Sequence, residues 1–184
     1  MLILIQKGKN MSKFPYKNPE TLRQYFRGKS LEQLIEINLS YGPHFENLEN
    51  TIDRLTQEIS TREEKLSVLL KGREELSQNY EKIVIEQQQY ENNRSSIMGD
   101  SCTGAERYLA LNALGMSPLD RYYSNSNSLQ NEIDATYKKL NELNSHLALS
   151  KNQRSKAVSE LKILNPIIDE KRRELEVAPQ FTLT

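Results

Sequence analysis

The sequence predicts an all-α protein: an elongated antiparallel coiled-coil hairpin with short N-terminal helices and a small helical head at the hairpin tip. Apolar residues recur at alternating steps of three and four from Phe45 to Ile97, and again from Leu129 to Ala178. Only 36% of the 184 residues are apolar and 27% are charged, with a mean hydropathy of −0.72. We therefore expect the apolar residues to line helix seams and not a compact core.

Residues 1–43 are predicted to form a basic segment with two short helices. One helix begins with an N-cap residue followed by proline, and the other begins with a capping box. A glycine marks the end of each helix. The starts are Asn18-Pro19 and Ser30 with Gln33, and the stops are Gly28 and Gly42-Pro43.

The heptads predict a first arm over residues 44–98 and a second over 129–178, followed by a tail at 179–184. Pairing Ile97 with Leu129 also pairs Leu48 with Ala178, so both ends of the arms agree on one hairpin register. That register places Arg73 opposite Ser150 to Arg154, and Arg62 near Leu164 to Pro166. The polar residues that interrupt the seams are Arg62, Arg73 and Arg154.

Residues 99–128 are predicted to form the head. Thr103 and Glu106 match a capping box, Gly115 is a helix stop, and residues 124–128 read as a polar hinge before the second arm. The head residues form either a contact patch for a partner or the head's own small core, because tyrosine suits both. They are Tyr108, Leu109, Leu111, Tyr122 and Tyr123.

A two-helix hairpin buries only one stripe of each helix and is marginally stable alone. Apolar residues outside the seam, such as Leu70 and Val84, widen the stripe. We therefore expect a third surface, which is the N-terminal helices, a second copy in a four-helix bundle, or another protein. Among these we favour a homodimer.

The charge of the whole chain is balanced, with 25 basic and 25 acidic residues, so any nucleic-acid interaction must be local. The first thirty residues are basic, and they offer a nucleic-acid contact as the alternative function. A specific major-groove helix is disfavoured because Glu32 and Glu36 would repel phosphate. The candidate residues are Lys13, Lys17, Arg23, Arg27 and Lys29.

No motif predicts an enzyme, a cofactor or a metal. His44, His146 and Cys102 fall at separate places in the predicted hairpin, which argues against a catalytic triad or a zinc site. Gly28-Lys29-Ser30 imitates the end of a phosphate-binding loop, but Arg23 occupies the position of its first glycine.

The remaining signals concern location. One cysteine suits a reducing compartment, and no apolar run reaches the roughly 20 residues that span a bilayer, so we expect a cytoplasmic protein. Lys7-Gly8-Lys9 is consistent with a purine-rich ribosome-binding site before Met11, which suggests a bacterial or phage gene and a non-native segment 1–10. The predicted function is a non-catalytic protein–protein interaction module: an adaptor, chaperone, assembly factor or protein inhibitor.

Overall fold

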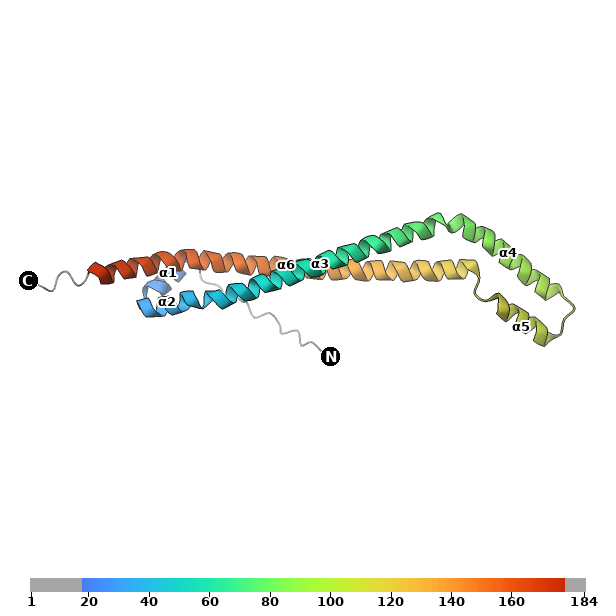
Figure 1. The fold of residues 1–184 in the computed structure, drawn as a ribbon, viewed down its shortest axis with the longest axis horizontal. Helices are drawn as coiled ribbons and strands as arrows, with labels where there is room; N and C mark the ends of the chain where they lie inside the picture. Colours follow the sequence, from blue (N-terminus) through green and yellow to red (C-terminus); the bar gives the residue numbers. More distant parts are fainter. Residues whose placement is uncertain (1–17, 178–184) are drawn as a thin grey trace, which may run out of the picture. The chain divides into compact units, whose positions relative to one another are not determined.

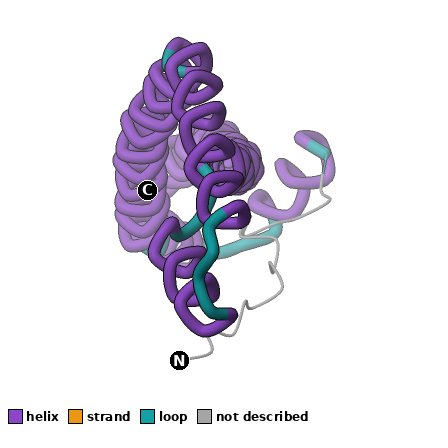
Figure 2. The backbone as a smooth tube through the Cα atoms, turned by 90° about the vertical axis from the view of Figure 1, so that its right-hand side faces the viewer, coloured by secondary structure: helices purple, strands orange, loops and turns teal. Residues whose placement is uncertain are grey.

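The computed structural model describes residues 18–177, which are 92% helical and contain no strand (Figure 2). Our expectations for the Met11 start, for Lys13 and Lys17, and for the tail concern residues outside this range. The described helices are α1 (Pro19–Arg27), α2 (Leu31–Leu39), α3 (Tyr41–Gln78), α4 (Tyr80–Gly99), α5 (Gly104–Leu114) and α6 (Pro118–Val177), labelled in Figure 1.

The capping signals in the sequence mark helix starts as predicted. The Asn18 side chain accepts a 2.7 Å hydrogen bond from the Thr21 amide, and Pro19 is the first residue of α1. Reciprocal capping boxes start α2 and α5, at Ser30 with Gln33 and at Thr103 with Glu106. Gly115, with a φ of 68°, follows α5 at a backbone conformation that favours glycine.

The prediction that Gly42-Pro43 ends the second short helix is wrong. Helix α2 ends at Leu39, and α3 begins at Tyr41, so Gly42 and Pro43 lie in the first turn of α3. Proline is well tolerated there because the first amides of a helix have no partner within the helix, and its φ is already helical.

The first predicted arm is two helices, because α3 and α4 are separated at Asn79. Both the backbone amide and the side-chain amide of Asn79 donate to the Glu75 carbonyl, at 3.2 and 2.8 Å. A side chain that competes for a backbone acceptor disfavours a continuous straight helix. The heptad pattern alone does not reveal this interruption.

Helix α6 begins at Pro118, eleven residues before the predicted start of the second arm at Leu129. The Ser117 hydroxyl caps it by accepting a 3.1 Å hydrogen bond from the Asp120 amide. The prediction of a polar hinge at residues 124–128 is wrong: these residues are helical and lie within α6, and a weak helix propensity such as that of Ser and Asn does not by itself end a helix. The short helix of the predicted head is α5.

The chain divides into two units, one of residues 18–58 with 143–177 and the other of residues 59–142. We call the first the four-helix unit, because it contains α1, α2, the start of α3 and the end of α6. We call the second the paired-helix unit. It contains the end of α3, all of α4 and α5, and the start of α6.

The four-helix unit has a continuous apolar core. Side chains from all four of its helices contribute, and the Tyr41 hydroxyl in this core donates a 2.7 Å hydrogen bond to buried Glu160. Burial, followed by the hydrogen bond to Glu160, raises the pKa of Tyr41 far above its ordinary value. The buried members are Leu22, Phe26, Leu34, Tyr41, Ala157, Leu164, Ile167 and Ile168.

The paired-helix unit consists of two helix pairs, α3 with α6 and α4 with α5. Lys65 of α3 lies 3.2 Å from Glu132 of α6, and Arg73 donates a 3.3 Å hydrogen bond to Gln130, so the two segments are antiparallel. Helices α4 and α5 lie against each other (Figure 1). The predicted register is therefore wrong: it placed Arg73 opposite Ser150 to Arg154, because it assumed a continuous first arm and a later start of the second.

The heptad positions are nevertheless the less exposed ones along α3 and α6. Leu48, Leu55 and Ile59 are buried on α3, and even Thr136, a polar residue seven positions after Leu129, is buried on α6. The Thr136 hydroxyl donates a 2.7 Å hydrogen bond to the Glu132 carbonyl, which satisfies its hydrogen-bonding requirement inside the seam.

Candidate functional site

An open groove of about 930 Å³ lies in the paired-helix unit between the end of α3 and the start of α6. Its apolar lining comes from Leu66, Leu70 and Leu76 of α3 and Tyr122 of α6. The charged residues along it are Glu63, Lys71, Arg73 and Glu74. We call this feature the α3–α6 groove.

A second recess, of about 420 Å³, lies between the same helices. It is lined by Gly72, Asn79 and Leu129 among others, and Leu76 contributes to both hollows. The seam between α3 and α6 is thus accessible along this stretch. In the four-helix unit, by contrast, α1 and α2 provide additional cover. A helix pair with an uncovered apolar stripe is typical of a surface that binds another element.

Three tyrosines gather beside the α3–α6 groove. The Tyr80 ring lies 5.1 Å from that of Tyr122, and the Tyr122 ring lies 5.5 Å from that of Tyr123. The hydrogen bond between the Tyr123 and Tyr80 side chains raises the pKa of Tyr123. The break at Asn79 places Tyr80 at the start of α4, so it contributes to this cluster. The sequence analysis placed residue 80 only within the first arm.

Two side-chain bonds fix the surroundings of the cluster. The Gln87 side chain of α4 accepts a 3.1 Å hydrogen bond from the Leu119 amide at the start of α6. The Tyr90 hydroxyl donates a 3.0 Å hydrogen bond to the Gly115 carbonyl after α5. These contacts satisfy polar groups at helix ends and link α4 to the segment before α6 and to its first turn.

The residues predicted for the head lie on two helices. Tyr108 and Leu109 of α5 are each 66% exposed, Leu111 is half-buried, and the other two are Tyr122 and Tyr123 of the tyrosine cluster. None of the five residues is buried: Leu111 and Tyr122 are half-buried, and Tyr108, Leu109 and Tyr123 are open to solvent. Their role in binding a partner stays a prediction.

The three polar interruptions have different surroundings. Arg62 is half-buried on α3. Arg73 is exposed, bonds to Gln130 and lines the α3–α6 groove together with Tyr122. Arg154 is exposed in the four-helix unit, where its Nε lies 2.6 Å from Glu49. Arg73 therefore joins the candidate site, whereas Arg154 pairs with an acid elsewhere.

The basic residues predicted to contact nucleic acid are partly engaged within the chain. Arg27 lies 3.8 Å from Glu170, and the Lys29 ammonium lies 5.1 Å from the centre of the Tyr25 ring. Arg23 is exposed. Arg23 and Arg27 are four positions apart on α1 and share one exposed face, and their contact with nucleic acid stays a prediction.

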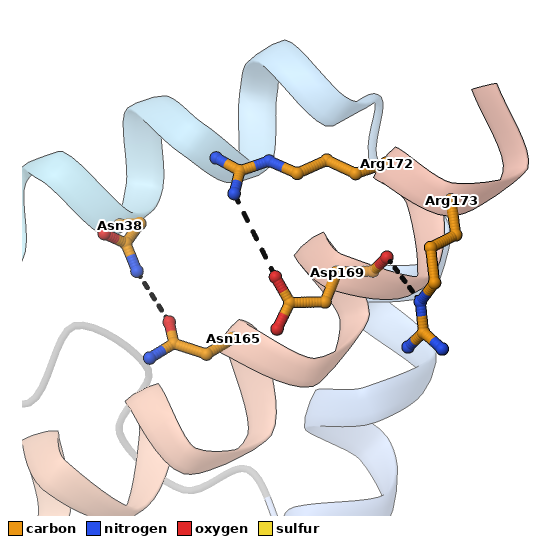
Figure 3. A network of polar contacts seen from close by, with 5 residues as sticks. All are labelled: Asn38, Asn165, Asp169, Arg172 and Arg173. Carbon is orange, nitrogen blue, oxygen red and sulfur yellow. Dashed lines mark hydrogen bonds and ion pairs between the residues drawn. The ribbon is translucent and has the colours of Figure 1, made fainter. Parts of the chain in front are cut away.

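A polar recess of about 310 Å³ lies in the four-helix unit between α2 and α6. Figure 3 shows Asn38 of α2 facing Asn165 of α6, with a 2.7 Å hydrogen bond between their side chains. Nearby, Arg172 lies 4.0 Å from Asp169, whose carbonyl accepts a bond from Arg173. Because these groups pair with one another, we interpret the recess as a contact that fixes α2 on α6.

The α3–α6 groove contains neither histidine nor cysteine. His44 packs near Tyr41 and Phe45 in the four-helix unit, and Cys102 is half-buried between α4 and α5. Within residues 18–177, no group of three or more His, Cys, Asp or Glu side chains is placed to hold a metal ion. In the same range, none of the helices combines the length and apolarity needed to cross a bilayer.

The groove therefore combines an apolar lining, a charged rim and an aromatic cluster, which is the chemistry of a contact surface. Compared with known proteins, the chain matches no protein-family model, no curated protein and no solved structure.

Proposed function

We propose that the protein is a non-catalytic interaction module, built as the antiparallel coiled-coil hairpin that its heptads predict. In this proposal the paired-helix unit binds an amphipathic helix of a partner protein in the α3–α6 groove. The adaptor, chaperone, assembly-factor or inhibitor roles and the cytoplasmic location belong to the same proposal. The observation that carries it is the open groove lined by Leu66, Leu70, Leu76 and Tyr122.

The shape and chemistry of the groove support a helix as its occupant. It runs between two helices, so a third helix laid along it would complete a three-helix arrangement and bury both apolar walls. Tyr122 and the neighbouring tyrosines supply the aromatic anchors that often dominate binding energy. Glu63, Lys71, Arg73 and Glu74 would contact the polar edges of that helix.

The test is affinity capture from native cells followed by mass spectrometry, using the full-length chain and a groove variant, Leu70→Asp. A charge in the groove should abolish capture of the specific partner, because that charge would be buried without a counter-ion. Tyr122→Ala should weaken capture at least about tenfold, as expected for an aromatic anchor.

Leu149→Asp is the matched control, since Leu149 is 59% exposed and lies on α6 in the four-helix unit. It introduces the same charge on an exposed leucine and should leave capture unchanged. Circular dichroism must show that all variants stay helical. Equal capture by the wild type, Leu70→Asp and Tyr122→Ala would contradict the proposed site.

A further inference from the structure

We propose that the four-helix unit also binds a second copy of the chain, with α3 of each copy lying on α6 of the other. The surface responsible is a charged face that the α3–α6 groove does not include. This inference goes beyond the proposed function, because it names a second interface and its occupant.

Two parallel stripes make up this face, one on each helix. Their members follow the steps of three and four that keep residues on one side of an α-helix. On α3 they lie beside the seam positions, and on α6 they include the seam positions Leu147 and Arg154. The stripe on α3 is acidic: Gly42, Glu46, Glu49, Asp53 and Thr56. The stripe on α6 is mainly basic: Leu147, Lys151, Arg154, Val158 and Lys162.

The face is open to solvent. Val158 and Ile167 are nine positions apart on α6, which turns them about 180° from each other. Ile167 packs into the core with residues of α1 and α2, whereas Val158 is 38% exposed. The helices that cover the core therefore leave the side of α6 that carries Val158 uncovered.

Several charges on the face make no ion pair within the described part of the copy. Glu46, Asp53, Lys151 and Lys162 are exposed and make no ion pair with another residue of the described range. Only the centre of the face is paired, by Glu49 and Arg154 at 2.6 Å. That pair sets the relative height of the two stripes. Because the helices are antiparallel, Asp53, which is four residues after Glu49, is level with Lys151, which is three residues before Arg154. In the same way, Glu46 is level with Val158.

Two copies can pair through this face about a two-fold symmetry axis that is either perpendicular or parallel to the helices, and charge complementarity favours the parallel axis. A two-fold axis perpendicular to the helices would place acid on acid and base on base, which is repulsive. An axis parallel to the helices keeps every residue at its own height and places the acidic stripe of one copy on the basic stripe of the other. Asp53 of one copy then faces Lys151 of the other, at both symmetric positions. All neighbouring helices in that four-helix arrangement are antiparallel.

The test uses two charge-reversed variants of the full-length chain. One carries Lys151→Glu with Lys162→Glu, so both of its stripes have a net negative charge. The other carries Glu46→Lys with Asp53→Lys, so both have a net positive charge, and the Glu49–Arg154 pair is kept in each. Each variant alone should be monomeric, because like charges would face each other, whereas an equimolar mixture should form a heterodimer.

The measurement is sedimentation velocity at about 100 µM protein, a concentration suited to a weak dimer. We expect a wild-type dimer that weakens about tenfold when salt rises from about 50 to about 500 mM, since exposed pairs are screened. A wild-type monomer at low salt, a mixture that stays monomeric, or single variants that dimerise like the wild type would each overturn the proposal. Should one variant fail to fold, the wild-type salt series and the other variant still decide it.

Leu70→Asp distinguishes this interface from the partner groove. It lies outside the charged face and should dimerise like the wild type while losing the partner. If Leu70→Asp loses the dimer as well, the second copy occupies the α3–α6 groove and the charged-face interface is wrong.

Discussion

The two units of this protein use similar helices with different degrees of cover. In the four-helix unit, α1 and α2 complete a core in which Phe26, Leu34 and Leu164 are fully buried. In the paired-helix unit the buried residues are Ile59, Ile133, Thr136 and Leu140, whereas residues 60–78 of α3 contain none and neither α4 nor α5 contains one. The contrast shows that a heptad seam can specify pairing without providing a closed core.

This difference assigns separate roles to the two units. The four-helix unit supplies most of the burial, and therefore most of the hydrophobic stabilisation. The paired-helix unit leaves apolar surface on both sides of its seam, at the groove and at the smaller recess. Substitutions in equivalent positions of the two units should consequently have unequal effects on the free energy of unfolding.

The largest effect is expected from Leu164→Ala compared with Leu76→Ala. Leu164 is fully buried in the core, so its truncation should lower the free energy of unfolding by about 2–5 kcal/mol. Leu76 is half-buried and borders two hollows, so its loss should cost about 1 kcal/mol or less. Urea unfolding followed by circular dichroism measures both; equal losses would mean that the units are equally well packed.

A second, smaller effect concerns Tyr41 and Glu160. Removing the hydroxyl in Tyr41→Phe takes a donor from a buried carboxylate and should cost about 1–3 kcal/mol at neutral pH. Because the pKa of Tyr41 is raised in the fold, the native state holds this proton more tightly than the unfolded state. Its contribution is therefore complete below the ordinary tyrosine pKa and decreases as the pH rises above it.

Thermal unfolding between about pH 8 and 11 measures this dependence, since ordinary tyrosine ionises near pH 10. The wild type should lose stability across the alkaline half of that range, and Tyr41→Phe should lose less. Tyr137→Phe is the control, because Tyr137 is 46% exposed on α6, and it should follow the wild-type slope. Identical slopes for all three proteins would show that Tyr41 is not the responsible group.

The smallest comparison uses the two capping boxes, one in each unit. Ser30→Ala at the start of α2 should lower the free energy of global unfolding by about 1 kcal/mol, because α2 is part of the core. Thr103→Ala at the start of α5 should mainly loosen residues 104–114, because α5 contributes no buried residue.

Hydrogen exchange measured together with urea unfolding distinguishes a loss of global stability from local loosening of α5. Faster exchange confined to α5 in Thr103→Ala, with an unchanged urea midpoint, is the expected result. A Thr103→Ala midpoint shifted as far as that of Ser30→Ala would show that the two units unfold as one.

Local features of the fold could be predicted from the sequence because they depend on neighbouring residues. The Ser30 and Thr103 capping boxes, the Asn18 cap and the Gly115 stop each rest on contacts within a few positions. The heptads likewise identified the less exposed stripe of α3 and α6, because burial against any partner requires the same periodicity.

The register and the groove could not be predicted, because they depend on where distant segments meet. Helix α6 starts at Pro118, and α3 and α4 are separated at Asn79. Together these features change which residues of α3 and α6 face each other, so Arg73 bonds to Gln130 and lines a groove with Tyr122. The signal for the earlier start was present in the sequence as Ser117-Pro118. Nothing in the heptads marked Asn79, because its side-chain bond to the Glu75 carbonyl leaves the spacing unchanged.

Hydrogen exchange of the wild-type chain at residue resolution tests the contrast between the units most directly. Amides of residues 157–168 should be the slowest, while those of 66–78 and of α4 and α5 should exchange far faster, since local opening is easier where little apolar surface is buried. Protection of residues 66–78, α4 and α5 equal to that at 157–168 would contradict the claim that the α3–α6 groove is left open for a partner.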